Sequence, residues 1–282
     1  MNSYSYLMRL DRPLPILIML WPTLWSLVAA GLDFPSPSII FIFITGGFLM
    51  RTLGCVFNDI ADHKFDAYVK RTKKRMIATN FISVQSAVIV GSTLLLFAFF
   101  FVLLLNRFTI FLSVISLLLT LVYPFFKRFF IIPQLILGCA FNFGIIMAYS
   151  SRINNISCEM FLIYIACIFW TLAYDTMYSL ADKPDDIRLG LKSSAITFGH
   201  CAGKVIVASQ FLMLSLLAGF GYLCGYGGGF YLSLMICCFM FYSQRCHWQK
   251  QTIITCIKAF SDNHWIGLVI FVGILLQNYK IF

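Results

Sequence analysis

The chain has 282 residues, of which 60% are hydrophobic and 11% are charged, and its mean hydropathy is +0.87. A soluble domain has about 45–50% apolar and about 25% charged residues, so this composition excludes an ordinary soluble globule and a disordered chain. The net charge of +10 would suggest nucleic acid in a soluble protein. In an apolar chain it indicates basic loops beside an anionic membrane surface, and we expect no nucleic-acid partner.

Long apolar runs separated by short polar breaks predict an all-α protein that crosses the membrane many times, because an open backbone cannot face lipid. The run 94–105 does not alternate in polarity as a barrel strand would. The first run begins like a signal peptide but continues without a cleavage site into a second apolar run, so it is interpreted as a transmembrane helix. Nine helices are predicted in one domain that spans residues 1–282, at 14–31, 38–57, 82–104, 108–125, 131–150, 159–180, 205–224, 229–244 and 264–280.

Basic residues are distributed unevenly between the two sides of this predicted bundle. With the N-terminus placed inside, only Arg107, Arg152 and Lys280 fall on the outer side, and the other 18 of the 21 Lys and Arg residues fall on the inner side. By the positive-inside rule, the N-terminus and the loops after the second, fourth, sixth and eighth helices are expected in the cytoplasm.

Seven of the 11 acidic residues fall in two short stretches, 58–66 and 175–186, each at the cytoplasmic end of a predicted helix. Residues four apart share one face of a helix, so the first stretch forms a polar stripe of Asn58, Asp62 and Asp66, with Asp59 beside it. Like charges at this spacing repel, and a divalent cation is the natural counter-charge. Carboxylate and amide oxygens are ligands of the kind that Mg²⁺ prefers.

The second stretch carries a matching stripe of Asp175, Asp182 and Asp186, with Tyr178 between them. Asp62 and Asp182 are 120 residues apart, with four predicted helices between them. An even number of helices returns the chain to the same side, so both stripes are expected at one end of the bundle. The pattern predicts two similar four-helix units.

Cationic side chains accompany the acids. Arg51 lies seven residues before Asn58 on the same helix face, below the membrane surface, where a charge is costly and indicates a function. A side chain that reaches to the interface is the alternative for Arg51. The basic loop 70–75, Arg128 and Lys192 lie near the stripes, although membrane orientation alone would explain them. Acids, a metal and several cations in one site suit a pyrophosphate.

The segments GCVFNDIADHKFDAYVKRT (54–72) and YDTMYSLADKPDDIRLGLKSSAITFG (174–199) resemble the two signatures of the UbiA superfamily of intramembrane prenyltransferases. Within it they are most similar to the branch that prenylates 4-hydroxybenzoate. The segments LMRLDRPLPILIMLWPTLW and YPFFKR are similar to that branch as well. The resemblance implies a helical bundle around a central cavity, Mg²⁺ as cofactor, and a bacterial inner membrane. It implies transfer of a polyprenyl group from polyprenyl diphosphate to the ring carbon ortho to the hydroxyl of 4-hydroxybenzoate, a step of ubiquinone biosynthesis.

The resemblance also implies roles for single residues. Arg51 matches the arginine that holds the carboxylate of the aromatic acid, and Arg128 and Lys192 match basic positions near the diphosphate. Asp59, Asp175 and Tyr178 are further expected substrate contacts. The expected metal ligands, which with Arg51 form the expected catalytic set, are Asn58, Asp62, Asp66, Asp182 and Asp186. The chain departs from the common pattern at Pro15, His63, Met76 and Asn80, which is expected to change local loop geometry.

Three alternatives stay open at this point. The same scaffold could use another acceptor, such as a naphthoate, haem, chlorophyll or a lipid, although the second signature with Asp175 and Tyr178 favours 4-hydroxybenzoate. A divalent-cation transporter or channel would need acids along the membrane depth, whereas these acids cluster at one surface. A purely structural membrane protein would not explain two matched stripes.

Overall fold

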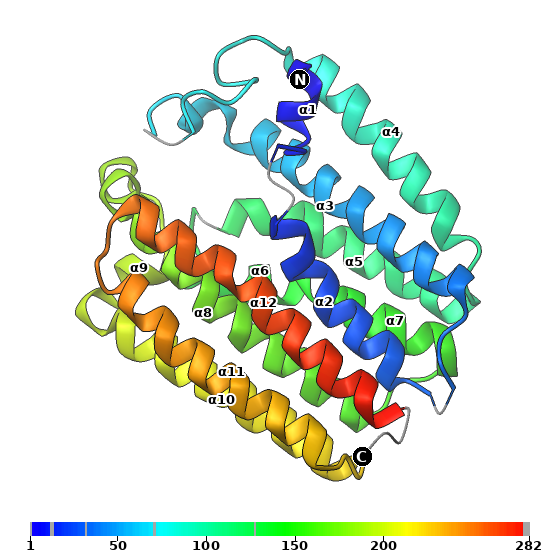
Figure 1. The fold of residues 1–282 in the computed structure, drawn as a ribbon. Coiled ribbons are helices and arrows are strands. Elements are labelled where there is room, and N and C mark those ends of the chain that lie inside the picture. Colours follow the sequence, from blue (N-terminus) through cyan, green and yellow to red (C-terminus); the bar gives the residue numbers. More distant parts are fainter. Residues whose placement is uncertain (1, 12–13, 32, 70–71, 127, 279–282) are drawn as a thin grey trace.

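The structure is a computed structural model that describes residues 2–11, 14–31, 33–69, 72–126 and 128–278. Its described residues form helices and no strand, which confirms the predicted all-α fold (Figure 1). The elements are α1 (Ser3–Leu7), α2 (Leu14–Ala29), α3 (Pro37–Asp66), α4 (Val84–Val102), α5 (Arg107–Phe126), α6 (Pro133–Phe141), α7 (Phe143–Ile153), α8 (Cys158–Leu189), α9 (Ser194–Thr197), a 3₁₀ turn (Gly199–Cys201), α10 (Ala202–Leu223), α11 (Gly228–Trp248) and α12 (Ile253–Asn278).

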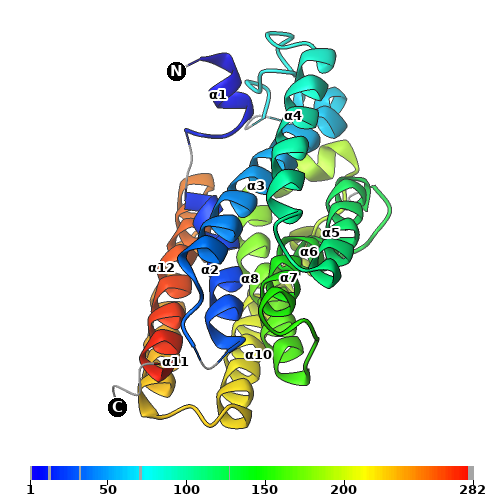
Figure 2. The ribbon, with the colours of Figure 1, turned by 90° about the vertical axis from the view of Figure 1, so that its right-hand side faces the viewer.

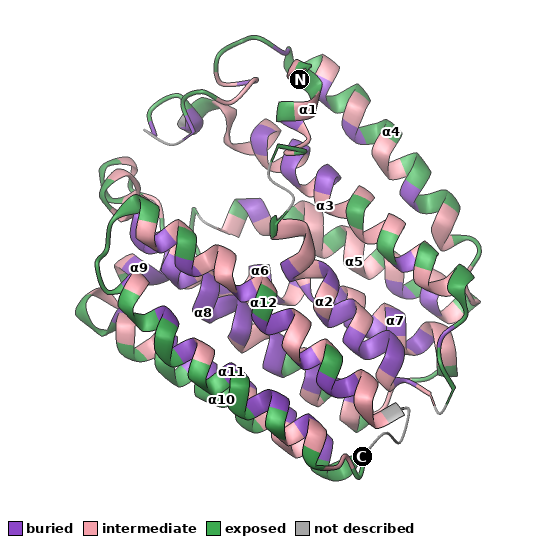
Figure 3. Cartoon of the chain, in the orientation of Figure 1, coloured by how far each residue is buried: buried purple, intermediate pink, exposed green. Residues whose placement is uncertain are grey.

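The long helices form one bundle in which α2, α8 and α12 pack against one another (Figures 1 and 2). On one side of these three, α10 packs on α8 and α11 packs on α12. On the other side lie α3, α4 and α5, and the broken helix α6–α7 joins the two sides through contacts with α5, α8 and α2. Buried residues concentrate on α2 and α8, and exposed residues follow the outward faces of α4, α10 and α11 (Figure 3).

Within the described residues, seven helical segments are long and apolar enough to cross a membrane. They are Pro37–Lys64, Val84–Val102, Arg107–Phe126, Pro133–Ile153, Cys158–Leu189, Gly199–Leu223 and Ile253–Gln277. Seven of the nine predicted spans thus match a helix that is both long and apolar enough to cross a membrane. The other two predicted spans correspond to α2 and α11, which pack on α12. The chain is a multi-pass membrane protein.

The two helices that carry the acidic stretches run further than predicted. The segment 38–57 becomes α3, which continues as a helix through Asp66, and 159–180 becomes α8, which continues to Leu189. The helix α8 ends at Gly190, whose φ of +66° suits a residue without a Cβ, and Leu191 N donates to Asp186 O at 3.0 Å. Both acidic stretches are therefore helical, which is the condition for acids four residues apart to share one helix face.

Two further helix boundaries differ from the prediction. In each case the reason is a polar side chain that is buried and hydrogen-bonded within the bundle. Asn142 splits the predicted helix 131–150 into α6 and α7, and its Nδ2 donates to Gly138 O and to Thr171 Oγ1, both at 2.8 Å. The last helix begins at Ile253, not at 264, since Asn263 is fully buried inside it and accepts from Trp170 Nε1 at 2.8 Å. Each polar group is satisfied within the bundle, so neither forms an exposed loop.

The core is centred on Trp25 of α2 and Trp170 of α8, which are fully buried and stacked with their ring centroids 5.4 Å apart. Replacing Trp170 with alanine is expected to lower the free energy of unfolding by about 3–5 kcal/mol, because it opens a cavity and leaves Asn263 without its donor. Thermal unfolding of the purified protein in detergent would measure this. Phe211→Ala on the exposed face of α10 is the control and should change the melting temperature little.

Candidate active site

One large cavity, with a volume of about 1240 Å³, lies inside the bundle and is lined by both acidic stretches. The predicted site residues in its wall are Arg51, Asn58, Asp59, Asp62, Asp66, Asp175, Tyr178, Asp182, Asp186 and Lys192. The helices α3 and α8, whose acids are separated by more than a hundred residues, thus present them to one common space. This was the arrangement that the spacing of the two stripes predicted.

The cavity is rich in acids at one end and mostly apolar beyond it, apart from Arg51 and a few hydroxyl and amide side chains. The helix α3 lines it from Ile42 to Asp66, a distance of about 36 Å at the rise of an α-helix. The wall at the Ile42 end is completed by apolar residues of α4 and α5, among them Phe99 and Leu117. We call the end lined by Asn58, Asp62, Asp66, Asp182 and Asp186 the acidic end. The space suits a ligand with a charged head and a long apolar tail.

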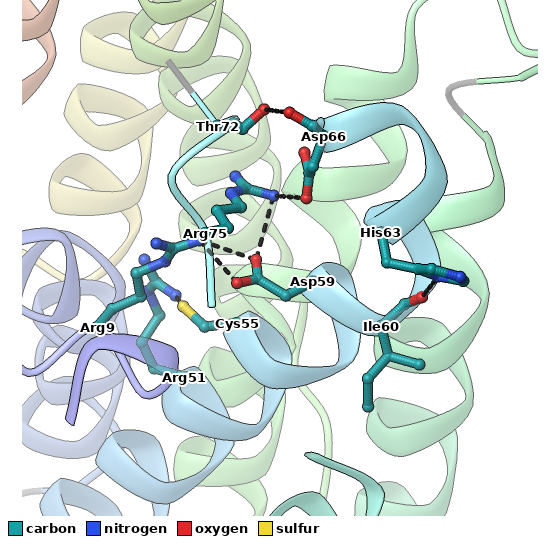
Figure 4. A network of polar contacts seen from close by, with 9 residues as sticks. All are labelled: Arg9, Arg51, Cys55, Asp59, Ile60, His63, Asp66, Thr72 and Arg75. Atoms are coloured by element: carbon teal, nitrogen blue, oxygen red, sulfur yellow. Dashed lines mark hydrogen bonds and ion pairs between the residues drawn. The ribbon is translucent and has the colours of Figure 1, made fainter. Parts of the chain in front are cut away.

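Asp59 differs from the other acids because two arginines pair with its buried carboxylate. Its exposed fraction is 1%. Arg9 Nη2 lies 2.8 Å from Oδ1 and 3.1 Å from Oδ2, and Arg75 Nη1 lies 3.1 Å from Oδ1 (Figure 4). Asp59 was predicted as a substrate contact, and in this structure its carboxylate pairs with two cations of the protein, Arg9 and Arg75.

Arg75 also pairs with Asp66, a predicted metal ligand, with 2.7 Å between Nη1 and Oδ2. The backbone carbonyl of Asp66 accepts from Thr72 Oγ1 at 3.0 Å, which turns the chain back toward α3. Arg9 and Arg75 were both missed as site residues. The sequence places Arg75 only in the basic loop after the first stretch, where Lys70 and Arg71 lie outside the described residues, and no spacing signal connects Arg9 with Asp59.

Arg51 lies deeper in the cavity, about 10 Å along α3 from Asn58. Its Nη1 contacts Cys55 Sγ, and its Nε is buried with no hydrogen-bond partner among the described residues. Figure 4 shows Arg51 beside Arg9 and Arg75, whereas His63 points away and its Nδ1 lies 2.7 Å from Ile60 O. A guanidinium whose buried Nε has no acceptor, in the wall of the cavity, suits an anionic group of a ligand.

Hydrogen bonds of Ser194 hold the segment after α8 beside the cavity. Ser194 Oγ lies 2.7 Å from Thr176 Oγ1, and Ser194 N donates to Gln134 Oε1 at 2.9 Å. These contacts hold the preceding Lys192 and Ser193 in the cavity wall. The Ser193 hydroxyl is buried without a hydrogen-bond partner among the described residues, a feature that the sequence does not signal.

One predicted residue is not brought to the site. Arg128 is exposed and stands outside the described lining of the cavity. Its Nη2 donates to Ala61 O at 3.1 Å, and its guanidinium carbon lies 5.2 Å from the centre of the Phe125 ring. Arg128 thus contacts the backbone of α3 within the first acidic stretch.

The donors at the acidic end fit Mg²⁺ bound together with a substrate. They are carboxylate and amide oxygens, the hard ligands that Mg²⁺ prefers. Among the described side chains, no three His, Cys, Asp or Glu groups converge into a site that holds an ion alone. Mg²⁺ is usually held by one or two carboxylates and the phosphates of a substrate, so an open arrangement of acids on two helices matches that use.

The sequence model of the UbiA prenyltransferase family matches residues 19–271. The chain belongs to this family. It is 48% identical over 277 residues to the 4-hydroxybenzoate octaprenyltransferase of Francisella tularensis subsp. mediasiatica, a match that covers 98% of either chain. It is 44% identical over 273 residues to the enzyme of the same name from Pectobacterium atrosepticum, covering 97% of this chain and 95% of that one.

Solved structures of UbiA homologues share the fold. The apo structure of a UbiA homologue from Aeropyrum pernix K1 superimposes with a TM-score of 0.79 at 22% identity, covering 92% of this chain and 97% of that chain. A UbiA homologue from Archaeoglobus fulgidus bound to GPP and Mg²⁺ gives a TM-score of 0.70 at 15% identity, covering 97% of this chain and all of that chain. The UbiA fold of this chain is thereby established.

Proposed function

We propose that this UbiA-family protein transfers a polyprenyl group from polyprenyl diphosphate to 4-hydroxybenzoate and releases diphosphate. The observation that carries the proposal is the single cavity that joins an acidic end on α3 and α8 to an apolar length along α3, α4 and α5. The curated relatives named 4-hydroxybenzoate octaprenyltransferase support the acceptor and the donor. The UbiA homologue solved with GPP and Mg²⁺ supports the cofactor.

Different residues of the chain would bind the donor and the acceptor. Asn58, Asp62, Asp66, Asp182 and Asp186 would hold Mg²⁺ and the diphosphate at the acidic end. Bound Mg²⁺ supplies positive charge that offsets the charge that develops on the diphosphate as the allylic C–O bond breaks. The apolar wall holds the tail and excludes water from the allylic cation.

Arg51 would orient the acceptor. Its guanidinium pairs with a carboxylate in a fixed fork, which turns the ring carbon ortho to the hydroxyl toward the allylic carbon. The C–O bond to diphosphate breaks to give the allylic cation, the ring carbon forms the new C–C bond with it, and the ring proton then passes to the released diphosphate. Asp175 and Tyr178 line the same cavity on α8, and Lys192, which follows the end of α8, lies in its wall as well.

We place the protein in a bacterial inner membrane with the acidic end toward the cytoplasm. The support is the basic bias of the inner segments, which hold 18 of the 21 Lys and Arg residues under that orientation. The acids also lie at one end of α3 and α8, which disfavours a cation path through the membrane.

The proposal is tested by incubating membranes that contain the protein with 4-hydroxybenzoate and octaprenyl diphosphate, followed by product mass. A prenylated acid is expected with Mg²⁺, and EDTA is expected to remove it until excess Mg²⁺ is added. Parallel reactions with a dihydroxynaphthoate test the acceptor. Product only with the naphthoate, or product unaffected by EDTA, would contradict the proposal. Divalent-cation flux in liposomes without product would favour the transporter.

A further inference from the structure

Asp59 has contacts that the proposed reaction does not explain. Its neighbours Asn58 and Asp62 are partly buried and line the acidic end, whereas Asp59 is almost fully buried and accepts from two arginines. A carboxylate paired with two guanidinium groups has both of its oxygens engaged, since Arg9 contacts Oδ1 and Oδ2 and Arg75 contacts Oδ1. That arrangement suits a carboxylate that fixes the positions of two arginine side chains more than it suits a metal ligand.

Arg9 reaches Asp59 because the N-terminal segment docks beside the acidic end. Leu7 of α1 is fully buried and packs with Val56, Ile77, Ile82 and Ala87, which anchors α1 to α3 and to the segment before α4. Arg9 itself has a φ of +58°, a left-handed backbone that a residue with a Cβ adopts only when its surroundings hold it. Arg9 is a part of the cavity wall.

Arg75 enters the same cluster from the other side, between Asp59 and Asp66. Its side chain is 12% exposed, and that of Arg9 is 28% exposed. The cluster pairs two guanidinium groups, those of Arg9 and Arg75, with two carboxylates, those of Asp59 and Asp66. A guanidinium carries five N–H donors in a planar fork, and the contacts of Arg9 with Asp59 use one nitrogen, Nη2. Arg9 and Arg75 also both line the cavity, so an anion that enters the acidic end can contact their guanidinium groups.

We propose that Asp59 is a positioning residue that holds Arg9 and Arg75 in place to bind the diphosphate of the donor, and that the N-terminal segment is a part of the donor site. Asp59 acts through the two arginines and not on Mg²⁺. Long arginine side chains lose conformational freedom when they bind an anion, and a partner that fixes them beforehand lowers this cost. The inference rests on the proposed function, whose donor supplies the diphosphate.

The test compares Asp59→Asn with Asp62→Asn in the full-length protein. Asp59→Asn is expected to raise KM for polyprenyl diphosphate by roughly ten- to a hundredfold, the range of a weakened charge-assisted hydrogen bond. Its kcat and the Mg²⁺ concentration for half-maximal activity should change less than about threefold, which is small beside a tenfold effect. Asp62→Asn should instead lose turnover at every Mg²⁺ concentration.

Two further variants separate positioning from folding. Arg9→Ala should reproduce the rise in KM, and the double variant with Asp59→Asn should show less than the product of the two single effects, because one acts through the other. Asp59→Glu should recover part of the affinity. Asp185→Asn is the matched control, since Asp185 lies 3.9 Å from Arg188 and is not in the described cavity wall. Its kinetics should stay those of the unmodified protein.

A higher Mg²⁺ requirement in Asp59→Asn that excess Mg²⁺ overcomes would overturn the inference, and so would a loss of kcat with unchanged KM. Binding of inorganic pyrophosphate with Mg²⁺ to the purified protein, followed by thermal shift, needs no acceptor. Weaker binding by Asp59→Asn supports the inference even if 4-hydroxybenzoate is not prenylated, in which case only the proposed function fails. Equal binding by both proteins refutes the inference even if product forms.

Discussion

Asp182→Ala and, separately, Asp62→Ala are expected to leave the protein folded in the membrane and to remove prenyl transfer almost completely. Each carboxylate stands on a different helix at the acidic end of one cavity. If both helices hold Mg²⁺ and diphosphate, either variant removes a group that stabilises the charge of the leaving diphosphate. Loss of one such group lowers kcat by about a hundred- to a thousandfold. Single-turnover product mass at saturating donor and Mg²⁺ would measure the loss.

The control for this experiment is Asp185→Ala, in the same stretch as Asp182 but outside the described wall of the cavity. It should retain activity within about twofold, because its side chain does not line the described cavity wall. Melting temperatures of the three purified variants separate lost chemistry from lost folding. Substantial turnover in both Asp62→Ala and Asp182→Ala would refute a metal-binding role for the acidic end.

The part of the site that depends on local periodicity could be predicted from the sequence. Asn58, Asp62 and Asp66 share a helix face only if the chain is helical there, and α3 does continue through Asp66. The 120-residue separation of Asp62 and Asp182 predicted that two helices would bring their acids to one end, and both line one cavity. Helical spacing and an even number of crossings are properties of the chain itself.

The part of the site that depends on tertiary contacts could not be predicted in this way. Arg9 and Asp59 are 50 residues apart, and their pairing depends on how α1 packs through Leu7. Arg75 reaches Asp66 because the chain turns back after α3, at the Thr72 contact. A basic loop near a membrane is expected from orientation alone, so composition gives no means of separating Arg75 from the lysines beside it.

The helix boundaries also depend partly on tertiary contacts that the sequence pattern does not show. Ser261, Asp262, Asn263 and His264 form a polar run that favours a loop before the last helix, yet all four lie within α12. Asn263 is stable there because Ala259 O accepts from its Nδ2 and Trp170 Nε1 donates to its Oδ1. A polar residue that finds its partners inside a bundle cannot be distinguished from a turn residue by sequence pattern, since the partner is on another helix.

The position of Arg51 gives the second large expected effect. Arg51 is partly buried, and its buried Nε lacks a hydrogen-bond partner among the described residues, which is costly unless a ligand supplies an acceptor. If that anion is the carboxylate of 4-hydroxybenzoate, Arg51→Ala should raise KM for the acceptor by roughly a hundredfold, the cost of losing a paired charge inside a protein. KM for the polyprenyl diphosphate should change little. Steady-state kinetics with each substrate varied in turn would measure both.

The decisive comparison uses an acceptor without the charge, such as 4-hydroxybenzamide. Unmodified protein should prefer the acid strongly, and Arg51→Ala should lose that preference, because only the acid gains from the guanidinium. Arg51→Lys should recover only a part, since an ammonium lacks the planar fork that binds a carboxylate with two parallel hydrogen bonds. Arg107→Ala, at an exposed position on α5, is the control for loss of a positive charge. Equal losses with the acid and the amide would show that Arg51 does not bind the carboxylate.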